Sequence, residues 1–186
     1  MGRLGLLLCV GVFGAATFAG ASASASGGTT ICNGTLAPGS YQRVVVPNDS
    51  VCLSDGPVTI RAGLFVQQGA TVVLGSEENA AHTATINGGV HATNAMNVQI
   101  HFSTINGGYN EVGYDGFWNG FIRNNVHGSV NINGNTVMDP DGNEIVTNTI
   151  HGNLNCQGND PPPQVGDSGG SPNHVTGQET GQCVGL

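Results

Sequence analysis

The stretch IRNNVHGSVNINGN (Ile122–Asn135) returns 24 residues later as VTNTIHGNLNCQGN (Val146–Asn159), with six of fourteen positions identical. Upstream, TINGG at Thr85–Gly89 returns 19 residues later at Thr104–Gly108. A period of this length, made of short strands and Gly/Asn turns, is typical of β-solenoids, in which each coil stacks on the one before it. The self-similarity therefore favours a solenoid over a sandwich or a leucine-rich repeat.

The apolar residues of the chain are mostly Val and Ile in short alternating runs, and no helical period is sustained. We therefore predict an all-β fold, a single-stranded right-handed parallel β-helix of about six or seven coils. Stacking predicts two interior columns, Ile86, Ile105, Val126, Ile150 and Val175 in one, and Val90, Tyr109, Val130 and Leu154 in the other. Asparagines at matching turns are expected to hydrogen-bond from coil to coil.

The N-terminal residues have the pattern of an export signal, with Arg3 before an apolar run and small residues at Ala21–Ala25. We expect residues 1–25 to be a signal peptide, 26–160 the β-helix domain, and 161–186 a Pro/Gly-rich closing segment. The protein is then secreted, with no transmembrane anchor after cleavage. Because the 186-residue chain carries a formal charge of −8, we expect no nucleic-acid partner.

Four cysteines remain after signal cleavage, an even number that fits an oxidising compartment. The simplest pairing joins neighbours, Cys32 with Cys52 and Cys156 with Cys183, which would close each end of the domain. Zinc is the alternative, but the chain has no CxxC pair.

The C-terminal part of the chain also carries a resemblance. The segments NTIHGNLNCQGN (Asn148–Asn159) and PNHVTGQETGQC (Pro172–Cys183), separated by a proline run, resemble small secreted parallel β-helix proteins of high-GC Gram-positive bacteria. No established function is attached to those proteins, so the resemblance implies fold and export, but no activity.

GDSGGSP at Gly166–Pro172 and the His of Ala80–His82 match the nucleophile and base motifs of chymotrypsin-like proteases, with Asp115 as the third triad member. The neighbouring residues argue against this function. Polar residues precede Ala80 where the family has an apolar strand, no cysteine follows His82, and almost nothing apolar follows Gly170 to form a substrate pocket. We interpret Gly166–Gly170 as a loop and keep the serine protease as a remote alternative.

The segment YNEVGYDGFWNGFI (Tyr109–Ile122) gathers most of the aromatic residues, including the only Trp. Flat rings beside Asn and Asp suit sugar binding, so Tyr114, Asp115, Trp118 and Asn119 are candidate glycan contacts. The alternative is that these rings fill a wider coil.

Carboxylates concentrate in the turn MDPDGNE (Met138–Glu144), where Asp139, Asp141 and Glu144 are candidate Ca²⁺ ligands, although a Pro-Asp-Gly turn needs no ion. Together with Asp115 they are also the acid/base candidates of a polysaccharide-degrading enzyme. Such an enzyme needs two carboxylates within about 5 to 10 Å of each other in a groove.

His127 and His151 are expected to stack on the outside of the solenoid, in line with Asn87 and Asn106, about 4.8 Å apart. Two imidazoles at this spacing could share a metal, but no acidic ligand lies in the same column, so a solvated ladder is the favoured interpretation. No catalytic, cofactor-binding or metal residues are assigned. We expect an exported non-catalytic structural or binding module at the cell surface or outside the cell, with cell-wall or extracellular glycan as the candidate partner. The alternative is a polysaccharide-binding or polysaccharide-degrading β-helix.

Overall fold

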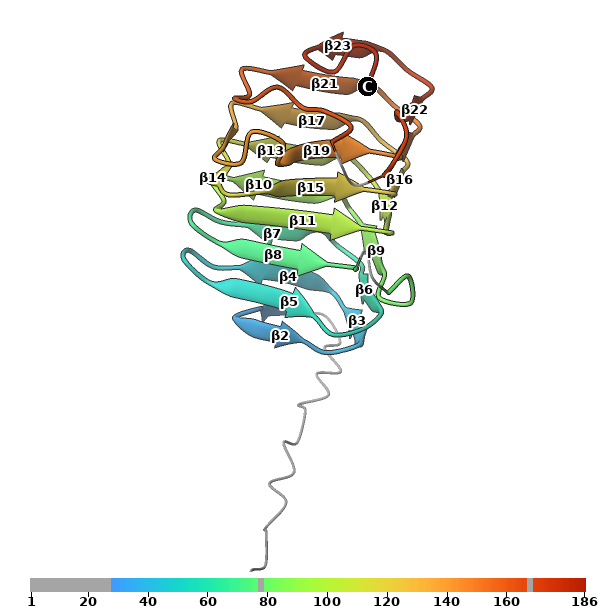
Figure 1. The fold of residues 1–186 in the computed structure, drawn as a ribbon. Coiled ribbons are helices and arrows are strands. Elements are labelled where there is room, and N and C mark those ends of the chain that lie inside the picture. The colour runs from blue at the N-terminus through green and yellow to red at the C-terminus, as the bar shows by residue number, and fades with distance from the viewer. Residues whose placement is uncertain (1–27, 77–78, 167–168) are drawn as a thin grey trace, which may run out of the picture.

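The computed structural model describes residues 28–76, 79–166 and 169–186, and these residues form strands, turns and loops without a helix. Figure 1 shows parallel strands stacked along one axis. One of the three long sheets takes one strand from each successive coil and has seven strands. The front strands run from left to right while the chain climbs, and the rear strands return, so the path is right-handed (Figure 1). The predicted fold class, a right-handed parallel β-helix of about six or seven coils, is confirmed, and the sheets contain about seven coils.

Three long parallel sheets form the walls of the solenoid. Sheet A consists of β1 (Thr29–Ile31), β4 (Arg43–Val46), β7 (Leu64–Val66), β10 (Val90–Thr93), β13 (Tyr109–Val112), β17 (Val130–Asn133), β21 (Leu154–Gln157) and β23 (Glu179–Gly181). Sheet B consists of β2 (Gly34–Leu36), β5 (Val51–Ser54), β8 (Thr71–Leu74), β11 (Asn97–His101), β15 (Asn119–Ile122) and β19 (Asn143–Val146). Sheet C consists of β3 (Gly39–Tyr41), β6 (Val58–Ile60), β9 (Ala84–Asn87), β12 (Thr104–Asn106), β16 (Asn125–Val126), β20 (Thr149–Ile150) and β22 (His174–Val175). A two-stranded sheet of β14 (Asp115–Gly116) and β18 (Thr136–Val137) lies at the corner between sheets A and B.

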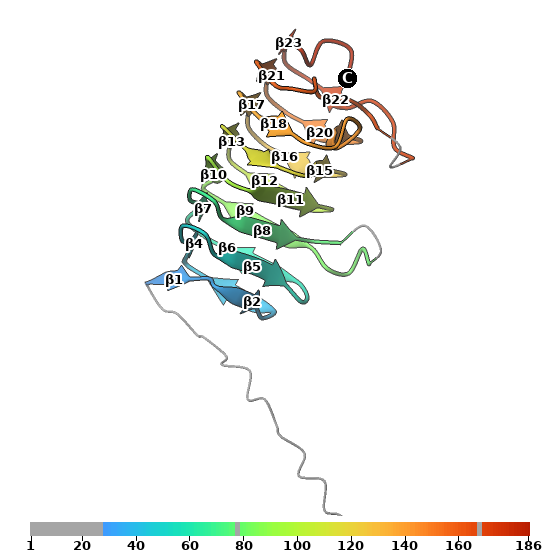
Figure 2. The same ribbon diagram turned by 60° about the vertical axis from the view of Figure 1, so that its left-hand side comes forward.

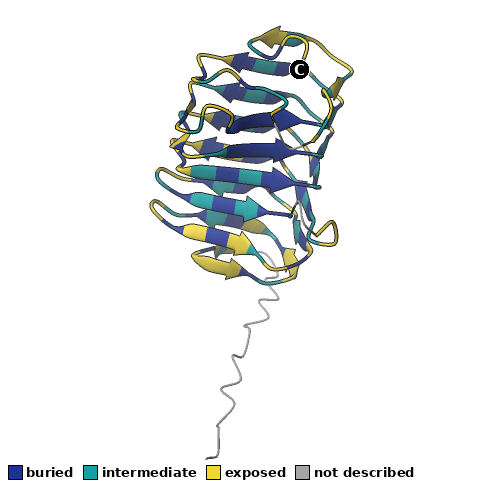
Figure 3. Ribbon diagram, in the orientation of Figure 1, coloured by how far each residue is buried: buried dark blue, intermediate teal, exposed yellow. Residues whose placement is uncertain are grey.

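Both predicted interior columns are present in the pairing register. In sheet C, Ile86 pairs with Ile105, which is followed by Val126, Ile150 and Val175. In sheet A the column runs through Val90, Tyr109, Val130 and Leu154. Strand residues alternate between the interior and the surface, which gives the banded burial pattern of Figure 3. Each coil thus buries its apolar face only by stacking on its neighbours.

Asparagine side chains tie successive turns together, as the repeat predicts. At the corner between sheets B and C, the backbone N–H of Ser103 donates to Asn124 Oδ1 (3.0 Å), and that of Asn124 donates to Asn148 Oδ1 (2.8 Å). Asn148 continues the series with Asn173 (3.0 Å). These amides satisfy backbone groups that turn inward at the corner, where strand pairing cannot satisfy them.

Each end of the domain carries a disulfide, and the predicted pairing is confirmed. Cys32 is bonded to Cys52 in the first two coils, and Cys156 is bonded to Cys183 in the last two. The closing segment 161–186 contributes β22 and β23, which extend sheets C and A by a further coil. The predicted signal peptide, residues 1–25, lies outside the described residues, and none of the described elements is a helix that could cross a bilayer.

Candidate functional site

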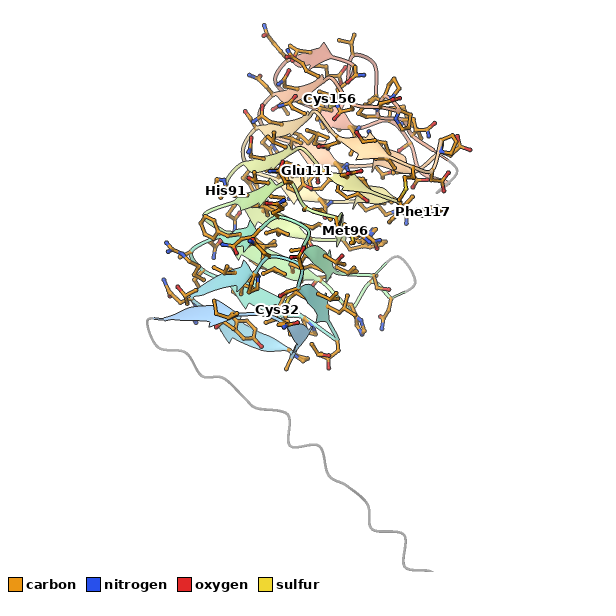
Figure 4. The ribbon with its side chains drawn as sticks, turned by 90° about the vertical axis from the view of Figure 1, so that its left-hand side faces the viewer. Cys32, His91, Met96, Glu111, Phe117 and Cys156 are labelled. Atoms are coloured by element: carbon orange, nitrogen blue, oxygen red, sulfur yellow. A yellow bond between two sulfur atoms is a disulfide. The ribbon has the colours of Figure 1, made fainter. Side chains whose placement is uncertain are left out.

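A glutamate lies inside the solenoid at a position that the repeat reserves for apolar residues. Register places Glu111 of β13 between Ala92 and Ile132, in an inward-facing column of sheet A. Its side chain is fully buried, in the body of the molecule in Figure 4. The sequence held the signal for this site: once Tyr109 is assigned to the interior, strand alternation points Glu111 inward as well.

Three buried side chains donate hydrogen bonds to the Glu111 carboxyl group. The Tyr109 hydroxyl donates to Oε2 at 2.5 Å, and the side-chain amides of Asn119 and Asn135 donate to Oε1 at 2.7 Å and 2.5 Å. Tyr109 lies in sheet A and Asn119 in sheet B of the same coil, whereas Asn135 lies at the corner between these sheets in the next coil. The carboxyl group therefore connects two sheets and two successive coils. We call Tyr109, Glu111, Asn119 and Asn135 the core polar cluster.

Burial controls the protonation of this cluster. Removal from water raises the pKa of Glu111 to about 7, although the hydrogen bonds from Tyr109, Asn119 and Asn135 act in the opposite direction. Burial and the adjacent Glu111 carboxyl also raise the pKa of the Tyr109 hydroxyl well above its usual value. Because all four members of the core polar cluster are buried, the cluster has no access to a substrate and is a structural element of the core.

The aromatic segment does not form one exposed sugar-binding surface. Tyr114 is buried, and its hydroxyl donates to the Trp118 carbonyl oxygen (2.7 Å). Asn119 belongs to the core polar cluster, Trp118 is half-buried, and Asp115 is exposed. Burial thus removes the Tyr114 and Asn119 side chains from any glycan contact, and the alternative in which rings fill a wider coil describes Tyr114.

Trp118 folds back over the outer face of sheet B. Its ring lies above Gly120, where a Cβ would approach Trp118 to 2.3 Å, and it stacks on His101 with 5.8 Å between ring centroids. Burial, followed by the charge of Arg123, lowers the pKa of His101 to about 4. The missing side chain of Gly120 therefore allows the tryptophan to cover this part of the sheet.

The carboxylates of the Met138–Glu144 turn do not converge. Asp139 Oδ1 accepts a hydrogen bond from the backbone N–H of Asp141 (3.2 Å) within its own turn. Glu144 is buried, because the segment at Gly166 passes directly over its carboxyl group. Among the described residues no three His, Cys, Asp or Glu side chains are grouped as metal ligands. Calcium binding at Asp139, Asp141 and Glu144 therefore remains a prediction. The burial of Glu144 also removes one of the acid/base candidates of a polysaccharide-degrading enzyme from contact with a substrate.

The outward histidine ladder exists as predicted. His127 and His151 stack with 4.7 Å between ring centroids and 4° between ring planes, and Asn106 donates to Asn87 in line with them (2.7 Å). Imidazole nitrogens direct their lone pairs within the ring plane, so two parallel rings cannot aim at one ion between them. The stacked arrangement fits the solvated ladder and not a shared metal.

The protease motifs are not supported by the surrounding fold. His82 lies in a loop between β8 and β9 of the solenoid, and Asp115 is an exposed residue of β14. Ser168 lies outside the described residues. The triad geometry requires a core that holds its members together, whereas His82 and Asp115 lie two coils apart and at different corners of the solenoid.

Comparison with known proteins gives no relative from which a site could be transferred: no family model, curated protein or solved structure matches this chain.

Proposed function

We propose that this protein is an exported, non-catalytic β-helix that acts as a structural or binding module outside the cell, at the cell surface or free of it. The observation that carries the proposal is the distribution of polar side chains. The groups with unusual chemistry, Glu111 and His101, are buried in the structure, whereas the exposed polar groups repeat in regular ladders from coil to coil. Ladders of this kind suit extended contact better than reaction at a single centre.

Export is supported by two features. Both disulfides link neighbouring coils at the ends of the domain, and such bonds persist in oxidising compartments. The apolar N-terminal segment with Arg3 has the pattern of a signal peptide. The resemblance of Asn148–Cys183 to secreted β-helix proteins of high-GC Gram-positive bacteria is a further argument for export within this proposal.

Expression of the full chain in an actinobacterial host tests this function. We expect the protein in the medium or the cell-wall fraction, with a mature N-terminus near residue 26 by mass spectrometry and both disulfides resistant to thiol alkylation. Incubation of the purified protein with soluble polysaccharides should release no new reducing ends. Retention in the cytoplasm with free thiols, or measurable chain cleavage, would refute the proposal.

A further inference from the structure

Charged side chains are segregated around the solenoid. The outward-facing described carboxylates lie on sheet B or at its two corners, and these are Asp49, Asp55, Asp115, Asp139, Asp141, Glu144 and Asp160. Two other described carboxylates, Glu111 and Glu179, occupy inward register positions of sheet A, paired with Ile132 and Leu154. The outward positions of sheets A and C and the corner between them, which we call the A–C face, thus carry no described carboxylate.

The A–C face carries cationic groups instead. Arg43 begins β4 and lies over the Phe65 ring (5.2 Å), and Phe65 stacks on His91 in the next coil (5.2 Å). Arg61 is exposed immediately after β6, at the corner between sheets C and A. Figure 4 places His91 at the opposite margin of the molecule from Phe117, which belongs to the acidic side. The local charge of this face therefore opposes the net charge of −8.

Hydroxyl and amide groups repeat along the same face. The outward column of sheet C contains Thr59, Thr85 and Thr104. A second outward column, in sheet A, contains His91, Asn110 and Asn131. Neighbouring strands lie about 4.8 Å apart, so these groups form a straight array parallel to the solenoid axis, along the stack seen in Figure 2. An array of this form matches a linear polymer with repeated hydroxyl groups.

The two sides of the molecule also differ in accessibility. On sheet B, Gln164 pairs with Glu144 of β19, Gly166 lies over the Glu144 carboxyl group and Gly170 lies against Val146, so both of these β19 side chains are buried. On the A–C face, Arg43, Arg61 and His91 are exposed. The cationic face is therefore open in the structure, whereas the later coils of sheet B are covered by the chain itself.

We propose that the A–C face binds an anionic polysaccharide whose chain lies along the solenoid axis. The arginines attract its charged groups, and the threonine and asparagine columns form hydrogen bonds with its hydroxyl groups. Nucleic acid is the less suitable polyanion, because phosphate contacts from Lys and Arg dominate such complexes, whereas the described residues of the A–C face include two arginines and otherwise mainly hydroxyl and amide side chains. This inference rests on the proposed extracellular binding function and names its ligand class.

Affinity electrophoresis of the full-length mature protein tests the assignment, with carboxymethyl-dextran as probe and unmodified dextran of equal length as the uncharged comparison. We expect retardation by the charged polymer alone, weakening as salt rises from about 50 to 200 mM because screening shortens the range of the attraction. The double variant R43Q/R61Q should bind about tenfold more weakly, since each surface ion pair contributes up to roughly a factor of five.

Arg123 supplies a matched control. It lies over the Phe102 ring at 5.2 Å, as Arg43 lies over Phe65, but it belongs to the corner between sheets B and C. R123Q removes the same charge from the other side and should retain wild-type affinity, with unchanged thermal unfolding of each variant measured by circular dichroism.

Three results would overturn the inference: no retardation of the wild type, equal weakening by R123Q and R43Q/R61Q, or equal retardation by a single-stranded thymidine homopolymer. Each of these leaves the proposed export and absence of catalysis intact, because fractionation and reducing-end assays measure those separately.

Discussion

The buried carboxyl group of Glu111 makes the stability of the solenoid depend on pH. In the unfolded chain a glutamate has its ordinary pKa of 4.5, whereas burial raises the pKa in the folded protein to about 7. Below pH 4.5 both states bind the proton, and the stability is fully present. Between these two values the unfolded state loses its proton first, so stability decreases as pH rises and is lowest above pH 7.

The size of the effect follows from the two pKa values. A pKa difference of one unit between the folded and unfolded states corresponds to about 1.4 kcal/mol. The rise in the pKa of Glu111 from 4.5 to about 7 therefore destabilises the fold by roughly 3 kcal/mol at alkaline pH. Against a total of 5–15 kcal/mol for a typical domain, this change is large enough for urea titrations to resolve.

Glu111→Gln removes the proton equilibrium while it keeps the shape. The glutamine carbonyl oxygen can accept from Asn119 and Asn135, and its amide can donate to the Tyr109 hydroxyl oxygen. We expect the free energy of unfolding of the wild type, relative to that of the variant, to fall by about 3 kcal/mol between pH 4.5 and pH 8.

Asp115→Asn is the control for this experiment, because it removes an exposed carboxylate that solvent screens. Its pH profile should parallel that of the wild type. If the profile of Glu111→Gln is also parallel to the wild type, the carboxyl group does not titrate in this range and the reasoning from burial is wrong.

Three further substitutions probe other parts of the fold by urea unfolding. Tyr109→Phe removes a donor to the buried carboxyl group and should cost about 1–3 kcal/mol at pH 8, with a smaller loss at pH 5, where Glu111 is protonated; an equal loss at both would contradict a charge-assisted bond. Asn148→Ala leaves turn backbone groups unsatisfied and should cost about 1–3 kcal/mol, whereas an effect below 0.5 kcal/mol would show that water replaces the amide. The paired change of Cys156 and Cys183 to Ala should lower stability by roughly 3–4 kcal/mol, and reduction with dithiothreitol should then have no further effect at this end.

The interior columns could be predicted from sequence because the repeat and the strand alternation act together. Once Ile105 and Val126 are aligned, a shift by one residue would expose every apolar side chain, so only one register buries them all. The stacked pair His127 and His151 follows from the same register, one position along each strand.

The environment of the candidate site could not be predicted in the same way. Trp118 reaches over the sheet only because Gly120 offers no side chain there, and Glu144 is covered only because the segment around Gly166 returns across sheet B. Both contacts depend on where the chain travels after it leaves the repeat, and periodicity carries no information on that path. A surface residue and a covered one therefore look alike in the sequence.

From Ile86 to Ile150 the coils lengthen, and the corner between sheets A and B takes up the difference. Successive interior positions of sheet C at Ile86, Ile105, Val126 and Ile150 are separated by 19, 21 and 24 residues. The connection from sheet C to sheet A stays short, with only Gly128 and Ser129 between His127 and Val130, whereas the connection from A to B gains β14 and β18. A guest peptide inserted at the A–B corner would thus leave the pairing register unchanged, which makes this corner the natural position for lengthening the chain in evolution or for displaying an epitope on the scaffold.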